Sequence, residues 1–414
     1  MNSVHNGVGR GNIDKVNDFI FDVFAGMYFL NKLLPAFGYY LPGTVFLVLF
    51  AYLILFSLSR INAMPKEGNF LNMLLLLSVA VLTCVKFVFG GKATNVPIYL
   101  YGEMQVILYG MIVLSYQSKE REAKIKKLFS FVLINYVITG VTTIIGNIKY
   151  PQASRFLATF SSSDYLYGVY TKNNIGGFTF VYELVLIVPL IIYMLKKKRI
   201  NLLIGVSILF MIGIIIINAE YTTALLFYII SLMTILVHNL TLGKTVGLFS
   251  VLAAVMFSAS SFLSNVFLKL SVSINNPMFS TRFKYIAYSL IGKSMRDDSG
   301  VGDRMDLYKK SLDLFAESKG MGVWNERSVG GHSFIFDAMG SFGIIGIIAV
   351  IIVYFTVYEL YLKPYKNKEF YGYMVWSYLV AVVLAFLNPK AYYFFFMVML
   401  PLFAISMSDD LGEK

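Results

Sequence analysis

Cysteine, charge and proline are scarce in this chain of 414 residues. Cys84 is the single cysteine, which excludes an intrachain disulfide and a cysteine-rich metal site. Charged residues make up 14% of the sequence, against about 25% in a soluble domain. Because 57% of the residues are hydrophobic and gather in long runs, the composition predicts an all-α polytopic membrane protein, 1–414, with one transmembrane domain.

Several catalytic motifs are also missing from the sequence. It contains no Walker A or GxGxxG phosphate loop, no HExxH pair and no GxSxG elbow. The outward loops carry no acidic cluster of the kind that binds a divalent metal. We therefore expect neither ATP hydrolysis nor metal-assisted hydrolysis, and no cofactor. The polar start, 1–17, lacks the apolar core of a cleavable signal peptide, so the first span should direct insertion.

Apolar runs long enough to cross a bilayer recur along the whole chain. A span needs about 20 predominantly apolar residues, and about twelve runs approach this length. They lie near 19–34, 42–59, 70–89, 98–117, 126–147, 177–195, 200–217, 221–237, 245–263, 333–362, 370–387 and 391–407. No internal repeat relates one half of the chain to the other.

Lysine and arginine are distributed unequally between alternating loops, and this predicts the topology. One set of loops holds Arg60, Lys66, Lys119, Arg121, Lys124, Lys126, Lys127, Lys196, Lys197, Lys198, Arg199, Lys244, Lys363, Lys366 and Lys368. The loops of the other set, apart from the long segment 264–332, hold Lys92, Lys149, Arg155, Lys172 and Lys390. By the positive-inside rule the first set, the tail 1–18 and both termini are cytoplasmic. The net charge of +12 therefore reflects topology and does not indicate nucleic acid.

Two outward loops are long, 148–176 and 264–332. Loops of this length are usually functional or disordered. Within the second, an amphipathic helix is predicted near 303–319, with Asp303 as its cap. Its apolar stripe consists of Met305, Tyr308, Leu312 and Phe315. We expect this helix to lie against the membrane face of the protein.

The segment Gly330–Gly346 follows the second loop and opens the tenth span. His332 lies at the outward N-terminus of this span, where the helix dipole disfavours a positive imidazolium. A neutral imidazole there could accept a proton, although interfacial histidines are commonly structural. The glycines spaced three apart, Gly340, Gly343 and Gly346, are expected to let a neighbouring helix approach closely.

Basic side chains in the outward loops suit phosphate oxygens, because the arginine fork matches their geometry. The candidates are Arg155, Arg282, Arg304 and Lys172, each of which could equally be a solvated charge. Tyr150, Tyr165, Tyr167, Tyr170 and Trp324 form either an interfacial belt or stacking platforms for sugar rings. Inside the spans, Lys86, Glu103 and Glu183 form either a buried ion pair or part of an outward-facing cavity.

These motifs together resemble the bacterial O-antigen polymerase and ligase superfamily. The resemblance rests on the topology and on Gly302-Asp303-Arg304-Met305-Asp306-Leu307-Tyr308, Gly320-Met321-Gly322, Gly331-His332-Ser333 and Gly343-Ile344-Ile345-Gly346. Asn173-Asn174-Ile175-Gly176-Gly177 resembles the family's asparagine-rich re-entry into the sixth span, and Arg155 lies upstream, where members often place an arginine. The chain has His-Ser where His-Asn is commoner, which leaves the role of Ser333 open.

The resemblance implies a metal-independent glycosyltransferase in the bacterial cytoplasmic membrane, with its active site facing outward. The donor would be an oligosaccharide on undecaprenyl diphosphate, and the product an O-antigen, capsule or exopolysaccharide. Arg304 and Arg155 would clamp the diphosphate, with Arg282 as a weaker candidate, and His332 would be the general base. Lys172, Asn174, Tyr308 and Trp324 are the other expected substrate contacts. A chain-length regulator and a flippase are the expected protein partners.

Two other functions stay open on the sequence. A ligase of the same superfamily would transfer finished polymer to a lipid A core, and it would differ from a polymerase only in its acceptor. A twelve-helix secondary transporter is the alternative of another class. Transporters of this size usually contain repeated halves with broken helices at the midplane. Here the halves do not match, and most of the candidate chemistry lies in outward loops.

Overall fold

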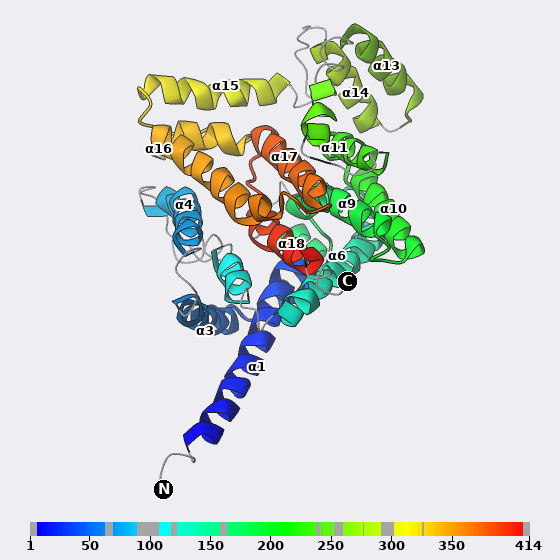
Figure 1. Ribbon diagram of the computed structural model, residues 1–414. Coiled ribbons are helices and arrows are strands. Elements are labelled where there is room, and N and C mark those ends of the chain that lie inside the picture. The colour runs from blue at the N-terminus through cyan, green and yellow to red at the C-terminus, as the bar shows by residue number, and fades with distance from the viewer. Residues whose placement is uncertain are drawn as a thin grey trace.

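The computed structural model describes residues 6–62, 69–88, 107–116, 122–157, 164–236, 241, 243–248, 250–251, 260–275, 277–290, 302–324 and 327–408. Over these ranges the protein is helical and contains no β-strand (Figure 1). The helices pack as a bundle of tilted rods, and α1 extends beyond the others at its N-terminal end (Figure 1).

The first half of the chain forms α1 (Asn6–Leu33), α2 (Pro35–Tyr40), α3 (Gly43–Asn62), α4 (Asn69–Val88), a helix at 107–115, α6 (Glu122–Lys149), α7 (Ala153–Phe156), α8 (Tyr165–Lys172) and α9 (Phe178–Lys196). The second half forms α10 (Leu202–Ala219), α11 (Thr222–Leu232), η2 (Met233–Ile235), α13 (Ser260–Ser273), α14 (Pro277–Leu290), α15 (Gly302–Glu317), α16 (Phe334–Val357), η3 (Tyr358–Leu362), η4 (Lys363–Tyr365), α17 (Tyr371–Leu387), η5 (Phe395–Met399) and α18 (Leu400–Ser408).

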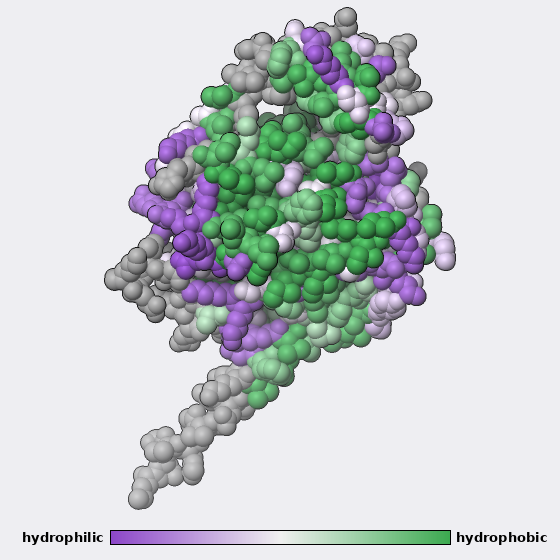
Figure 2. All heavy atoms as spheres, turned by 90° about the vertical axis from the view of Figure 1, so that its right-hand side faces the viewer, coloured by the Kyte–Doolittle hydropathy of each residue, from purple (hydrophilic) through white to green (hydrophobic). Residues whose placement is uncertain are grey.

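Helices occupy the described part of every predicted span. Four of them are long and apolar enough to cross a membrane: Ala123–Lys149, Phe178–Lys196, Leu202–Ala219 and Phe334–Tyr365. Figure 2 shows a broad apolar face with polar groups toward its edges. On α10, Leu203 and Phe210 are largely exposed, as expected of side chains that contact lipid. The chain is thus a helical membrane protein, and the count of about twelve spans stays a prediction.

α9 is the central helix of the bundle. Its side chains from Val181 to Met194 are all buried, because α10, α11 and α17 surround it. Trp376 on α17 and Phe403 on α18 are among the largest fully buried side chains. Since lipid is as apolar as leucine, this close packing, and not exclusion from water, holds such helices together. The rigid centre provides the support for the loops at its ends.

α16 is broken at Gly343, where φ is 60° and ψ is −140°. A Cβ atom at this position would lie 2.0 Å from the carbonyl oxygen of Gly320, so only glycine fits. The loop before α16 fills the break: the amide of Ile344 donates to the carbonyl of Gly320 over 2.8 Å, and the amide of Trp324 donates to Ser341 over 2.8 Å. The free backbone groups of the broken helix are thereby satisfied.

The expected role of the three spaced glycines is therefore right for one and incomplete for the others. Gly340 does allow close approach, since a Cβ atom there would lie 2.8 Å from the backbone of Ser311 on α15. Gly343 instead permits the break. Gly346 would meet the carbonyl of Ala338, in the first part of α16 itself. As a result α15 lies alongside the first part of α16 (Figure 1).

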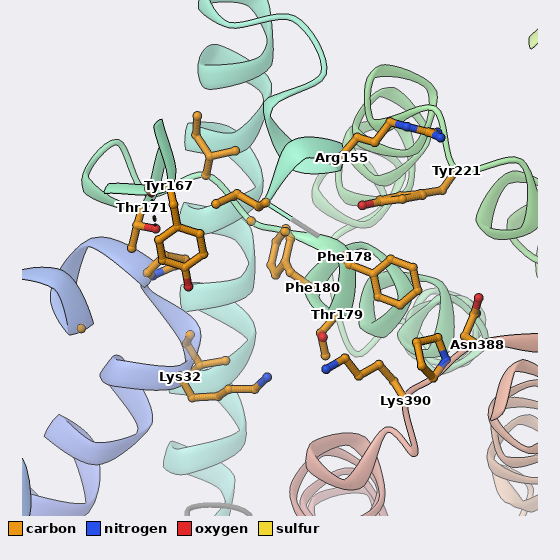
Figure 3. A pocket seen from close by; sticks show the side chains of 18 of the residues that line it. Lys32, Arg155, Tyr167, Thr171, Phe178, Thr179, Phe180, Tyr221, Asn388 and Lys390 are labelled. Carbon is orange, nitrogen blue, oxygen red and sulfur yellow. Dashed lines mark hydrogen bonds between the residues drawn. The ribbon is translucent and has the colours of Figure 1, made fainter. Parts of the chain in front are cut away.

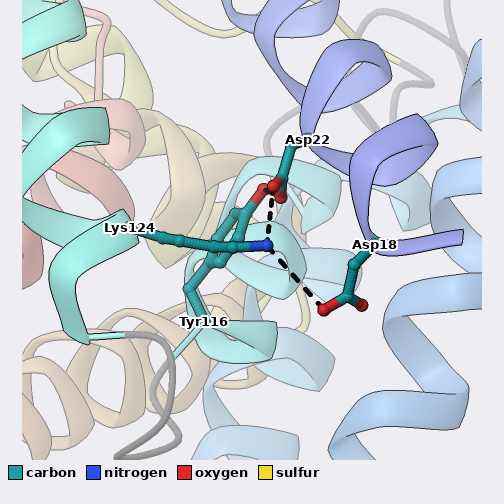
Figure 4. Close-up of polar contacts among 4 residues, drawn as sticks. All are labelled: Asp18, Asp22, Tyr116 and Lys124. Atoms are coloured by element: carbon teal, nitrogen blue, oxygen red, sulfur yellow. Dashed lines mark hydrogen bonds and ion pairs between the residues drawn. The ribbon is translucent and has the colours of Figure 1, made fainter. Parts of the chain in front are cut away.

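A polar cluster at the middle of α1 joins this helix to α6 and to Tyr116, which follows the helix at 107–115 (Figure 4). The ammonium of Lys124 on α6 lies 2.7 Å from the carboxylate of Asp22 and 3.8 Å from that of Asp18, both on α1. The hydroxyl of Tyr116 donates to Asp22 over 2.6 Å. The topology predicts that these residues lie on the cytoplasmic side. The cluster ties the middle of α1 to α6, and the last turn of α1 contributes Lys32 to the cavity described next.

Candidate functional site

A cavity of about 1020 Å³ lies among α1, α8, α9 and the loops that precede α16 and η5 (Figure 3). We call it the basic cavity. Its charged or titratable lining residues are Lys32, Arg155, His332 and Lys390, and its aromatic lining residues are Tyr39, Tyr167, Phe178, Phe180 and Tyr221. The described lining residues include no aspartate or glutamate. Such a cavity attracts anions.

The segments that line the basic cavity are distant in sequence but share a predicted side. They are 31–39, 155–157, 167–180, 221, 331–332 and 388–390. The alternating topology places each of them in an outward loop or at the outward end of a span. The structure brings all of them to one end of the bundle. A two-residue shift of the span boundaries does not alter this grouping.

Lys32 and Lys390 point toward each other from opposite walls of the basic cavity (Figure 3). The Lys32 ammonium lies 3.5 Å from a carboxylate oxygen of Glu183 and 5.4 Å from the centre of the Phe394 ring. The other Glu183 oxygen accepts a hydrogen bond of 2.7 Å from the Tyr136 hydroxyl. Glu183 is thus buried beneath the cavity as the counter-ion of Lys32, a partner that was not predicted from the sequence. Glu103 and the side chain of Lys86 lie outside the described residues, so their predicted roles are not tested.

Arg155 lies on α7, a single turn that the surrounding helices hold from two sides. Its guanidinium donates to the carbonyl oxygen of Glu220 over 3.2 Å. The Tyr221 hydroxyl donates to the carbonyl of Ser154 over 3.1 Å. On the other side, the Asn147 amide oxygen accepts from the Ser154 backbone amide over 3.1 Å. These contacts fix the arginine at the wall between α7 and the α10–α11 turn (Figure 3).

His332 is held by the residues on either side of it. The Asp337 carboxylate accepts from the Gly331 amide over 3.0 Å and from the Ser333 amide over 3.2 Å. Ser333 is the N-cap of α16, and its hydroxyl accepts from the Phe336 amide over 3.2 Å. The serine that departs from the family pattern therefore has a structural role. His332 directly precedes the cap, as the sequence predicts.

α15 supports the histidine loop from above. The Ser311 hydroxyl donates to the Asp337 carboxylate over 2.7 Å and accepts from the Gly330 amide over 2.9 Å. The Phe334 amide donates to the carbonyl of Asn388 over 2.8 Å, which joins the histidine loop to the loop that carries Lys390. The two loops thus form one hydrogen-bonded unit.

Arg304 lies in the N-terminal part of α15, the helix that the sequence predicts near 303–319. Because α15 begins at Gly302, Asp303 is inside the helix and does not precede it. Arg282 lies on α14. The side chains of Arg304 and Arg282 are outside the described part of the structure, so their predicted contacts with a diphosphate stay predictions.

Three other expected substrate residues do not line the basic cavity. The Lys172 ammonium lies 5.9 Å from the centre of the Tyr40 ring, beside the cavity-lining Thr171. The Tyr308 hydroxyl donates to the carbonyl of Leu387 over 3.0 Å, which joins α15 to α17. The Trp324 indole N–H donates to the carbonyl of Met321, within its own loop, over 2.8 Å. The positions of Tyr308 and Trp324 indicate packing roles.

Asn174 was also an expected substrate contact, and the structure gives it a positioning role instead. It is buried, with a left-handed φ of 55°. Its amide oxygen accepts from the Ala36 amide over 3.2 Å, and its amide nitrogen donates to the Thr142 hydroxyl over 2.9 Å. The side chain therefore fastens the turn before α9 to α2 and α6, and that turn carries the cavity-lining Gly176 and Gly177.

Sequence reasoning missed Lys32, Tyr221 and Asn388, and it counted Lys390 only toward topology. Lys32 lies in the last turn of α1, and Lys390 in the short loop before η5. The positive-inside rule makes basic residues infrequent at the outward ends of spans. The presence of Lys32 and Lys390 there was therefore the one indication in the sequence that these lysines have a role in a site. Nothing local in the sequence links these two lysines with Arg155 and His332.

No family model matches the chain, and no curated protein matches it. A proposal about function therefore depends on the residues of the basic cavity and on the resemblance of the short motifs.

Proposed function

We propose that this chain is a polysaccharide polymerase that joins undecaprenyl-diphosphate-linked oligosaccharide units at the outer face of the bacterial cytoplasmic membrane. The observation that supports it most is the meeting of His332 with Arg155, Lys32 and Lys390 in one cavity. A base and several cations that line the same cavity suit a reaction that releases a diphosphate.

The cationic side chains would bind the donor through its diphosphate. As the sugar–phosphate bond breaks, negative charge builds up on the leaving oxygen, and cations placed beforehand stabilise it. Arg155 offers paired N–H donors, and Lys32 and Lys390 offer point charges on opposite walls. Glu183 keeps the charge of Lys32 partly balanced while the cavity is empty. This arrangement would provide the stabilisation without a metal ion.

His332 would accept the proton of the acceptor. In this step a hydroxyl oxygen of the acceptor glycan attacks the anomeric carbon, and a new C–O bond forms. The bond between that carbon and the diphosphate oxygen breaks, and the undecaprenyl diphosphate leaves with the electron pair. The imidazole takes the hydroxyl proton. Tyr39, Tyr167 and Tyr221 would contact the sugar rings.

The test is the length distribution of the glycan in a deletion strain that carries variants. His332→Ala should lower the transfer rate by about 10²–10⁴-fold, as expected for loss of a general base, and leave single repeat units. Arg304→Ala, in the motif-bearing α15, should also shorten the glycan. His238→Ala, which the topology places at the cytoplasmic face, is the matched control. A full ladder from both His332→Ala and Arg304→Ala at normal expression would refute the proposal.

The same strain separates the polymerase from the ligase. A deletion that leaves single repeat units on the lipid indicates a polymerase. A deletion that leaves long lipid-linked chains without attachment to an acceptor core indicates the ligase. The chain-length regulator and the flippase expected as partners would be tested by co-purification with the full-length chain.

A further inference from the structure

A second cavity, of about 460 Å³, lies between the α6–α7 turn, the α10–α11 turn and the α13–α14 hairpin. We call it the amide cavity. Its polar lining residues are Asn147, Gln152, Asn218 and Glu220, and its main apolar lining residues are Ile217, Leu225, Ile274, Phe279 and Phe283. Its volume is within the range of about 300–1,000 Å³ that is usual for small-molecule sites.

The polar wall of the amide cavity contains two unusual backbone conformations. Gln152 and Glu220 both have left-handed φ values, 65° and 55°, although neither is glycine. Glu220 ends α10 and Gln152 precedes α7, so each conformation turns the chain at a helix end. Each directs a polar side chain into the lining of the same cavity.

The opposite wall of the amide cavity is aromatic. The Phe283 ring lies between those of Phe267 and Phe279, at centre-to-centre distances of 5.7 Å and 6.2 Å. The ring planes are inclined by 21° and 22°, so the three rings form a stack within the α13–α14 hairpin. A stack of this kind is a rigid apolar surface that suits a flat partner.

Charge limits which ligand the amide cavity can take. Among its described lining residues there is one carboxylate, that of Glu220, and no lysine or arginine. A phosphate group would be repelled there. An isoprenoid chain would leave the carboxylate and the amides of Gln152 and Asn218 beside hydrocarbon, which is unfavourable. The lining instead matches a neutral ligand that has hydroxyl donors on its edges and an apolar face.

We infer that the amide cavity is a binding subsite for a neutral sugar residue. The hydroxyls of the sugar hydrogen-bond to Gln152, Asn218 and Glu220, and its C–H face packs against Phe279 and Phe283. That this sugar belongs to the glycan being polymerised rests on the proposed function. The binding chemistry itself rests only on the lining residues.

The amide cavity shares a wall with the basic cavity. Glu220 lines the amide cavity, and its carbonyl oxygen accepts the hydrogen bond of Arg155, which lines the basic cavity. The Asn147 side chain binds Ser154, the neighbour of Arg155. A sugar in the amide cavity would therefore be separated from the reacting diphosphate by a single wall. This is the position expected of a sugar residue farther along the glycan.

The experiment measures binding of lipid-free sugars to the full-length protein in nanodiscs. The probes are methyl glycosides of glucose, galactose, mannose and rhamnose, detected by saturation-transfer difference NMR. At least one should bind, and Asn218→Ala and Glu220→Gln should each weaken it by about tenfold, as expected for loss of a hydrogen bond to a buried polar group. Asn367→Ala, at an exposed site in the loop between η4 and α17, is the matched control and should leave binding unchanged.

Glu220→Gln keeps the carbonyl that holds Arg155, so the wall between the cavities should stay intact. The thermal midpoint of unfolding of each variant is also measured, and an unchanged midpoint shows that weaker binding does not come from misfolding. Binding of none of the glycosides, or equal binding by the wild type and both variants, would overturn the subsite. A photoreactive geranylgeranyl phosphate that labels Phe283, while a photoreactive glycoside does not, would also overturn the sugar subsite and indicate a lipid site. None of these readouts involves glycan transfer, so failure of the proposed polymerase is seen separately, in the glycan ladder.

Discussion

The basic cavity and the amide cavity share a wall and differ in charge. Lys32, Arg155 and Lys390 line the first, with no acid among its described lining residues. Glu220 lines the second, with no lysine or arginine among its described lining residues. Glu220 lines one cavity, and its carbonyl oxygen holds Arg155 at the wall of the other. If the proposed function is right, the basic cavity takes the anionic part of the donor and the amide cavity takes a neutral sugar.

A glutamate placed in each cavity in turn should give the largest difference in activity between the two. Lys390→Glu places a carboxylate where the diphosphate is expected and should lower kcat/KM by about 10²–10³-fold. Asn218→Glu adds the same charge to the amide cavity and should cost about tenfold or less, because no phosphate lies there. The measurement is the initial rate with lipid-linked repeat units in proteoliposomes, and Lys366→Glu in the exposed loop before α17 is the control. Equal losses of kcat/KM in both variants would contradict the difference in charge preference between the two cavities.

A positioning residue of the basic cavity gives the next largest effect. Asp337→Ala leaves the amides of Gly331 and Ser333 and the hydroxyl of Ser311 without their acceptor. We expect about 10–100-fold lower kcat, since His332 loses its orientation, with KM for the donor little changed.

The free energy of unfolding of Asp337→Ala should also fall, by about 1–3 kcal/mol for each buried donor that is left without an acceptor. The measurements are steady-state kinetics and thermal unfolding in nanodiscs. Asp313→Ala, on the exposed side of α15, is the matched control and should change neither. Asp337→Asn retains one acceptor oxygen and should be intermediate. A rise in KM with kcat preserved would contradict a role through His332.

A change of ionic strength should give the smallest of these effects, and it should affect ligand binding to the two cavities differently. Between about 0.05 M and about 0.5 M salt the screening length falls from roughly 14 Å to roughly 4 Å, so attraction of a diphosphate weakens. KM for the lipid-linked donor should rise about threefold to tenfold over this range. Binding of a methyl glycoside should change by less than about twofold, because no charge is neutralised. A strong salt dependence of glycoside binding would place that ligand in the basic cavity.

Much of the framework could be predicted from local sequence patterns. Long apolar runs predicted the spans, and helices occupy their described parts, whereas amphipathic spacing predicted α15. His332 was expected at a helix N-terminus, and Ser333 is the cap of that helix. Arg155 and His332 were candidates for separate reasons, and both line the basic cavity. Each of these predictions depends on residues within a few turns of one another.

Other features depend on contacts between distant segments, and local patterns do not reveal them. Asn174 was expected to touch substrate because of its motif, yet its amide is satisfied by α2 and α6. Gly343 was expected to pack against a helix, yet it breaks one, because the loop at Gly320 occupies the gap. Lys32 gained its role from Glu183 on α9 and from the opposing Lys390.

The sequence by itself determined that the protein is a helical membrane protein and that a helix begins just after His332, and it predicted which loops share a side. These follow from hydropathy, charge asymmetry and capping, which act over short distances along the chain. Only the tertiary structure decided that three cations and a histidine line one cavity and that a cavity lined by amides and Glu220 adjoins it. Cavities are formed by side chains from different helices, so their charge is known only when the packing is known.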